Sequence, residues 1–144
     1  MQPQSSTPSS VPIGERVIGI RRVLFCHGAT VSGDEGPIEL SFSDGSVLLF
    51  ECGGSGEDLS ISRAPWLDPF EEPLSPENTE FVMQSGKWEA FDFGSHLWSY
   101  RRLIGRLLTS ATPLGSDSMR LVLEGSAMDI AAVADELRVR FVEL

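Results

Sequence analysis

The sequence predicts a mainly β protein of the α+β class, in which two related β-meander halves form a sandwich or a strongly curved sheet and a short helix is inserted between them. Three observations predict this fold. Short runs rich in β-branched residues alternate with turn residues, a capped helical segment lies near the middle of the chain, and the C-terminal third repeats phrases of the first third.

With 144 residues, the chain has the size of one domain that can bury its own core. Residues 1–12 are rich in Ser, Pro, Gln and Thr, so we expect them to form a flexible leader. A single β-rich domain should follow over residues 13–144. Its halves are expected at about 15–63 and 101–143, with a structured insertion at 64–93.

The first half begins with ERVIGIRRVLFC, whose β-branched residues predict a strand. Apolar residues then alternate from Ile38 to Phe42 and resume after Asp44-Gly45, which is the strongest turn signal in the chain. This pattern predicts a β-hairpin. The segment LSIS at 59–62 has apolar residues on one face and serines on the other, as expected of a further strand.

The insertion contains a helix start signal. Ser75 is a suitable N-cap, Pro76 is favoured at the first helical position, and an acidic residue follows in the first turn. We therefore expect a helix over 76–84 that ends at Gly86. The segment KWEAFDF, which comes next, predicts a strand with apolar residues on more than one side.

Two segments of the second half have mixed signals. Residues 97–108 carry apolar side chains at helical spacing, but Gly105 weakens a helix interior, so a strand over 102–110 is favoured. Residues 127–135 contain good helix formers behind a capping serine, and helix and strand both remain open there.

The repeated phrases occur in the same order in both halves, which favours an internal duplication of a β-meander. The alternative is that any two β-rich segments look alike. The matched pairs are Ile18-Gly19 with Ile104-Gly105, residues 38–42 with 119–123, and residues 58–62 with 136–140.

The chain is acidic, with a formal net charge of −10, and the acidity is concentrated in residues 34–92. Binding to nucleic acid or to an anionic membrane surface requires clustered Lys and Arg, so both are disfavoured as partners. There is no apolar run of about 20 residues that could span a bilayer, and the N-terminal residues do not resemble a signal peptide. A cytoplasmic protein is therefore expected, with Cys26 and Cys52 reduced.

Catalytic and metal-binding patterns are weak. The two histidines are His27 and His96, and adjacent residues such as Cys26 and His27 point to opposite faces of a strand. The glycine-rich CGGSGED lacks the Lys-Ser/Thr of a phosphate-binding loop, and SDGS lacks the further ligands of a calcium loop. We therefore predict no enzyme activity, no cofactor and no metal.

The strongest functional signal is the mixture of aromatic and acidic residues in 66–81. Aromatic side chains can anchor a protein partner while carboxylates attract a basic one. The alternative is that the aromatics cover the sheet and the acids keep the protein soluble. The candidate partner-binding residues are Trp66, Asp68, Phe70, Glu71, Glu72, Glu77 and Glu80, with Asp34, Glu35, Glu57 and Asp58 as further acidic candidates.

The hairpin segment ELSFSDGSVLLF at 39–50 resembles an L-x-F-x-D-G-x-x-L-x-L type hairpin of small acidic bacterial immunity proteins from polymorphic toxin systems. The resemblance implies a stoichiometric inhibitor that binds a basic toxin domain and covers its active site. We expect the chain itself to be a monomer or a weak dimer. It implies no catalytic residue. Two other classes stay open, namely a secretion chaperone or adaptor for an effector protein and a small-ligand-binding β domain.

Overall fold

The computed structural model of the chain describes residues 11–32, 35–70, 73–95 and 97–144, and it is mainly β with two antiparallel sheets. The predicted fold class is thereby confirmed. The first sheet contains β1 (Val17–His27), β2 (Thr30–Ser32), β3 (Ile38–Phe42), β4 (Val47–Cys52), β5 (Leu59–Ser62) and β6 (Lys87–Asp92). The second contains β7 (Leu108–Gly115), β8 (Ser118–Leu123), β9 (Ser126–Val133) and β10 (Glu136–Glu143). The helices are α1 (Pro76–Ser85) and α2 (Trp98–Arg101).

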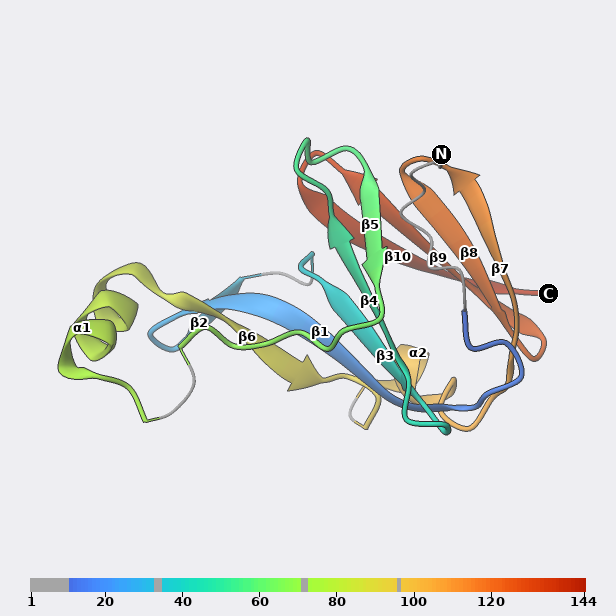
Figure 1. Cartoon of the computed structure of the whole chain (residues 1–144), viewed down its shortest axis with the longest axis horizontal. Coiled ribbons are helices and arrows are strands. Elements are labelled where there is room, and N and C mark those ends of the chain that lie inside the picture. Colours follow the sequence, from blue (N-terminus) through green and yellow to red (C-terminus); the bar gives the residue numbers. More distant parts are fainter. Residues whose placement is uncertain (1–10, 33–34, 71–72, 96) are drawn as a thin grey trace.

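Strand β1 belongs to two parts of the molecule. Its N-terminal half pairs with β3, while its C-terminal half pairs with β6 on one edge and with β2 on the other. Figure 1 shows that this second half, with β2, β6 and α1, projects away from the two packed sheets. We call this projection the arm, and it comprises residues 23–32, 64–70 and 73–92. The arm forms because β1 is long enough to pair with β3 in the sandwich and with β2 and β6 beyond it.

The two sheets pack face to face as a sandwich, with β4 against β9 and β10. Their inward side chains form one continuous apolar core. Its members with no exposed surface include Val17, Ile20, Ile38, Leu40, Phe42, Phe50, Leu103, Leu108, Leu121, Leu123, Met128 and Ile130. A register shift between Val17 and Gly19 lets both Val17 and Ile20 face this core.

The local signals of the first half and of the insertion are confirmed. Strands β3 and β4 form the expected hairpin, in which Gly45 has a φ of 88° and the Ser46 N–H donates to Asp44 Oδ1. Helix α1 begins as expected, because the Ser75 hydroxyl accepts a hydrogen bond from the Asn78 N–H at 3.1 Å. Gly86 is the C-cap.

The strand favoured over 102–110 is wrong for residues 102–106. One turn of helix, α2, is followed by a turn in which Gly105 has a φ of 91°, and β7 begins only at Leu108. The reason is tertiary pairing: the Gly105 N–H donates to Val17 O, and the Val17 N–H donates to Arg106 O. These hydrogen bonds join the turn before β7 to the start of β1, and they bring the two sheets together at one end.

The segment left open at 127–135 is a strand, β9, at the interior of the second sheet. Its one buried charge explains how a sequence of helix formers is held extended. Asp129 lies opposite Arg120 on β8 and Arg140 on β10, and both arginines donate to its carboxylate. Cross-strand pairing of charges thus stabilises the extended form.

The two halves have equivalent strand orders in part. Residues 38–42 form β3 and residues 119–123 lie in β8, and each of these strands pairs with the first strand of its half. Residues 58–62 include β5 and residues 136–140 lie in β10, and each of these strands is the last of its half. The third match differs, because Ile18 lies in β1 whereas Ile104 lies in the turn before β7. Internal duplication stays a prediction. Val11 and Pro12, assigned to the leader by composition, are partly or fully buried at the start of the described chain.

Candidate functional site

Two hollows share the side chains of Trp66 and Trp88. One is mainly apolar and has a volume of about 470 Å³, and we call it the apolar groove. The other has a volume of about 290 Å³ and three carboxylates in its wall, and we call it the acidic hollow. Trp66 belongs to the segment after β5, which runs along β1 and β6 in Figure 1, and Trp88 belongs to β6.

The apolar groove is built around two pairs of aromatic rings. Phe70 and Phe81 stack with centroids 5.4 Å apart, and Phe25 meets Trp88 edge to face at 5.5 Å. Helix α1 thereby contacts the 66–70 segment through Phe81, one of its few large apolar side chains. The remaining lining residues are Trp66, Leu67, Pro69, Ser85, Gly86 and Lys87.

The end of α1 is held close to β1, which closes one side of the groove. A Cβ at Gly86 would lie 2.5 Å from Cys26 O and 2.7 Å from Phe25 Cζ, and the residue has a φ of 79°. Glycine is therefore required there both for space and for backbone conformation. The His27 ring nitrogen Nε2 lies 3.1 Å from Met83 O and joins β1 to the helix a second time.

An ion pair between the partly exposed Arg21 and the buried Glu39 positions Trp66. Glu39, which is 4% exposed, accepts two hydrogen bonds from the Arg21 guanidinium and a third from the Trp66 N–H at 2.9 Å. Further along the segment, Lys87 Nζ donates to Asp68 Oδ2 at 2.8 Å and to Phe70 O at 3.2 Å. Charged side chains of β1, β3 and β6 thus hold the 66–70 segment in place. The rings of Trp66 and Phe70 line the apolar groove.

Acid should loosen this attachment. Burial opposes ionisation of Glu39, but the hydrogen bonds from Arg21 and the Trp66 N–H outweigh it and hold the pKa of Glu39 below its usual range. A lowered folded pKa contributes stability above the unfolded pKa of about 4.3, and this contribution is lost as pH falls through the folded value. We expect Glu39→Gln to lower the urea midpoint at pH 7, with a difference from the wild type that shrinks below about pH 4.

The matched control for this titration is Glu57→Gln, since Glu57 is an exposed carboxylate in the loop between β4 and β5 and lies outside any helix. Its urea midpoint should follow the wild type at every pH. A Glu39→Gln variant whose deficit were equally large at pH 7 and pH 3 would contradict the assigned role of the ionised carboxylate.

The acidic hollow gathers residues from distant parts of the chain. Glu35 precedes β3, Glu51 lies in β4, and Asp135 lies in the turn between β9 and β10. Two backbone hydrogen bonds hold this arrangement: Leu137 N–H to Glu35 O at 2.8 Å and Asp135 N–H to Gly56 O at 2.9 Å. The two indoles complete the wall on the side of the arm.

Cys52 also lines the acidic hollow, and both it and Cys26 are free thiols, as expected from the sequence. Burial raises the pKa of Cys52, and the nearby charges of Asp135, Glu136 and Glu57 raise it further. A thiol with a raised pKa is protonated at neutral pH and is a poor nucleophile. The electrostatic environment of the hollow therefore favours a bound cation over thiolate chemistry.

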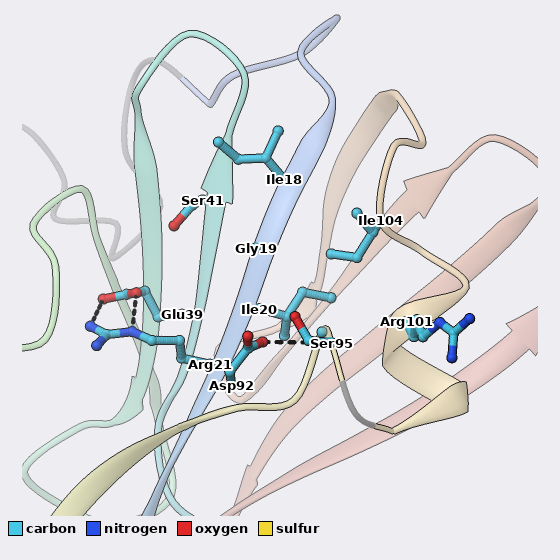
Figure 2. Close-up of a pocket in the computed structure, with 11 residues that line it drawn as sticks. Ile18, Gly19, Ile20, Arg21, Glu39, Ser41, Asp92, Ser95, Arg101 and Ile104 are labelled. Atoms are coloured by element: carbon cyan, nitrogen blue, oxygen red, sulfur yellow. Dashed lines mark hydrogen bonds and ion pairs between the residues drawn. The ribbon is translucent and has the colours of Figure 1, made fainter.

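Figure 2 shows a third hollow, of about 640 Å³, between the start of β1 and the turn after α2. Ile18 and Ile104 stand on opposite sides of it, and the Arg21–Glu39 ion pair forms part of its wall. Asp92 Oδ1 accepts a hydrogen bond from the Ser95 N–H at 3.0 Å. The carboxylates of this third hollow, Asp92 and Glu39, thus both accept hydrogen bonds from neighbouring residues. The Arg21–Glu39 ion pair also holds Trp66 in place on the arm.

The residues predicted from sequence fall into four places. Trp66 and Phe70 line the apolar groove, with Asp68 bound to Lys87 at its edge. Glu77 and Glu80 are exposed on α1, and Glu35 lines the acidic hollow. Glu57 and Asp58 lie in the loop between β4 and β5. Asp34, Glu71 and Glu72 lie outside the described residues.

Several residues of the site were not among the predicted partner-binding residues, and they include Phe25, Glu51, Trp88 and Asp135. For Trp88 a signal existed, because the strand predicted after Gly86 places an aromatic residue directly behind the helix. Phe25 is brought to the site by the pairing of β1 with β6, and Glu51 and Asp135 are brought together by the packing of one sheet on the other, which no local pattern indicates.

No protein-family model matches the chain, and no curated protein or solved structure matches it either. Among the described residues, no three His, Cys, Asp or Glu side chains lie close enough together to hold a metal ion. No helix in the described ranges is long and apolar enough to cross a membrane.

Proposed function

We propose that the chain is a stoichiometric protein-binding inhibitor, an immunity protein that neutralises a cognate bacterial toxin by covering a basic surface or active site. The observation that carries the proposal is the apolar groove on the arm. Leu67 is 78% exposed, Phe81 50% and Trp88 47%, and all three line this one groove. Apolar side chains gathered around a concave surface are typical of a site that a protein partner covers.

Charge supports a basic partner. Residues 64–93, which include most of the arm, contain seven carboxylates, and Lys87 is the one basic residue among them. An acidic surface of this kind attracts a cationic protein and orients it during encounter, while the apolar groove holds it afterwards. Inhibition then follows from occlusion and requires no catalytic residue on this chain.

The test starts from the native host, where the chain is used as bait at low salt to identify a cationic protein that binds one-to-one. That protein is then produced separately, and rescue of growth from its toxicity is measured. We expect the double variant Leu67→Asp, Phe81→Asp to lose rescue and to bind at least about 100-fold more weakly, because it places two charges in the groove.

The matched control is Leu114→Asp on β7, since Leu114 is a similarly exposed leucine, 52% exposed, that lies outside the groove. It should rescue growth like the wild type. Full rescue by the groove variant, with its fold intact by circular dichroism, would rule out the groove as the inhibitory surface.

A secretion chaperone or adaptor is the second candidate, because the same groove is suited to hold an apolar segment of an effector protein. The two functions differ in what is bound. A chaperone should retain a secretion segment and leave toxicity unchanged, and light scattering should then show a dimer of this chain in the complex. A toxic domain bound by a monomer favours the inhibitor.

A further inference from the structure

We propose that the apolar groove and the acidic hollow form one docking surface for a single extended segment of the partner, in which an apolar residue and an arginine are adjacent. The apolar side chain enters the groove and the guanidinium enters the acidic hollow. This inference rests on the proposed function, because it describes how the same arm recognises its partner.

The apolar groove and the acidic hollow are neighbours on the surface. Trp66 and Trp88 belong to the walls of both hollows, so the hollows adjoin each other at these two indoles. Neighbouring side chains of an extended peptide point to opposite sides, so one segment that runs along the two indoles can place one side chain in each hollow. The volume of the acidic hollow, about 290 Å³, is at the lower end of small-molecule pockets, which suits one side chain.

The lining of the acidic hollow suits a guanidinium group. The acidic hollow combines three carboxylates with two indoles, and a guanidinium interacts favourably with both. In the described part of the chain, no ion pair engages the side chains of Glu35, Glu51 or Asp135. A flat cation can stack on an indole face while its N–H groups donate to a carboxylate.

A buried cation also lies close to these carboxylates. Arg22 lies behind the hollow and donates from Nη2 to Gly36 O and Leu137 O, two lining residues. Arg22 and the exposed Arg138 share a neighbouring hollow with Glu35 and weaken the negative potential there, but within the described ranges neither forms an ion pair with the three carboxylates. Cys52 adds no charge while its thiol is protonated, as its raised pKa favours. The hollow therefore still favours a single incoming cation.

The indole wall is fixed in place rather than formed on binding. A Cβ at Gly36 would lie 3.0 Å from Trp88 Cζ3, so this ring packs directly against the backbone of the loop that carries Glu35. On its other side Phe25 holds Trp88 edge to face. Preorganisation of this kind lowers the entropy cost of binding a side chain.

The test uses short blocked peptides and needs no partner protein. Gly-Leu-Arg-Gly and Gly-Arg-Leu-Gly are titrated into the full chain, and their affinities are read from chemical shifts of the Trp66 and Trp88 indole N–H signals. We expect the tighter peptide to weaken about tenfold when citrulline, which is neutral, replaces arginine. Lysine in that position should bind more weakly than arginine.

A mutant cycle then assigns each side chain to its hollow. In the variant Glu51→Gln, Asp135→Asn, the difference between arginine and citrulline should disappear, whereas the difference between leucine and alanine should remain. In Phe81→Ala the reverse is expected. Asp117→Asn, in the exposed turn between β7 and β8, is the control and should change neither difference.

Equal affinity for arginine and citrulline peptides, or shifts confined to residues outside the two hollows, would overturn the inference. Lysine binding as tightly as arginine would overturn the guanidinium assignment. The proposed function has a separate readout, because growth rescue by Glu51→Gln, Asp135→Asn can be compared with rescue by the groove variant. Rescue lost only in the groove variant would retain the inhibitor and reject the arginine site.

Discussion

Replacing Arg22 with methionine should destabilise the fold by about 3 kcal/mol, measured as a lower urea midpoint at an unchanged dependence on denaturant. Arg22 is 1% exposed and forms no ion pair within the described part of the chain. Its guanidinium instead donates to Tyr100 Oη, Gly36 O and Leu137 O.

The expected loss comes from the groups left behind. Methionine fills a similar volume, but it leaves the buried carbonyls of Gly36 and Leu137 without these donors, and each unsatisfied buried group costs about 1–3 kcal/mol. The loss of stability is reduced because the variant also removes a buried charge whose Nε has no hydrogen-bond partner among the described residues. The three acceptors belong to α2, to the loop before β3 and to β10, so the variant weakens the contact between the sheets.

Arg138→Met is the matched control. Arg138 lies on β10 with its side chain 61% exposed and pairs with Glu136, and removing an exposed pair of this kind changes stability by less than about 1 kcal/mol. If Arg22→Met were as stable as the wild type, the cost of burying the charge would equal the gain from its hydrogen bonds. The guanidinium would then not account for the joining of the sheets.

Elements with local signals could be predicted from the sequence. Asp44-Gly45 needs only its own backbone conformation to set a hairpin, and Ser75-Pro76 caps a helix with atoms three residues away. Residues 102–106 could not be predicted in this way, because their conformation depends on hydrogen bonds to Val17 and its neighbours, more than 80 positions earlier in the chain. Local propensity and long-range pairing disagree there, and pairing decides.

The same distinction applies to the candidate site. The aromatic and acidic residues of 66–81 are close in sequence, so their pattern indicated a surface, and Trp66 and Phe70 do line the groove. The acidic hollow depends on Asp135 reaching Glu35 and Glu51, which lie about 90 residues away. Such a site follows from the packing of one sheet on the other and has no sequence pattern of its own.

Gly36→Ala should also be strongly destabilising, by about 3 kcal/mol, because the added methyl group has no space. Its Cβ would lie 1.8 Å from Val23 O and 2.9 Å from Val23 C, both backbone atoms that cannot move without disturbing β1. The loop would have to withdraw, which breaks the bond from Val23 N–H to Pro37 O and displaces the carbonyl that Arg22 binds.

Two measurements distinguish the steric clash at Gly36 from the general effect of replacing a loop glycine with alanine. Urea unfolding of Gly54→Ala is the control, since a Cβ at Gly54 meets nothing within 4 Å, and it should be neutral or slightly stabilising. Tryptophan emission of folded Gly36→Ala should also change, because the withdrawn loop no longer supports Trp88. Equal midpoints for the two alanine variants would mean that the loop adapts without loss, and the indole wall beside Glu35 would then not be rigid.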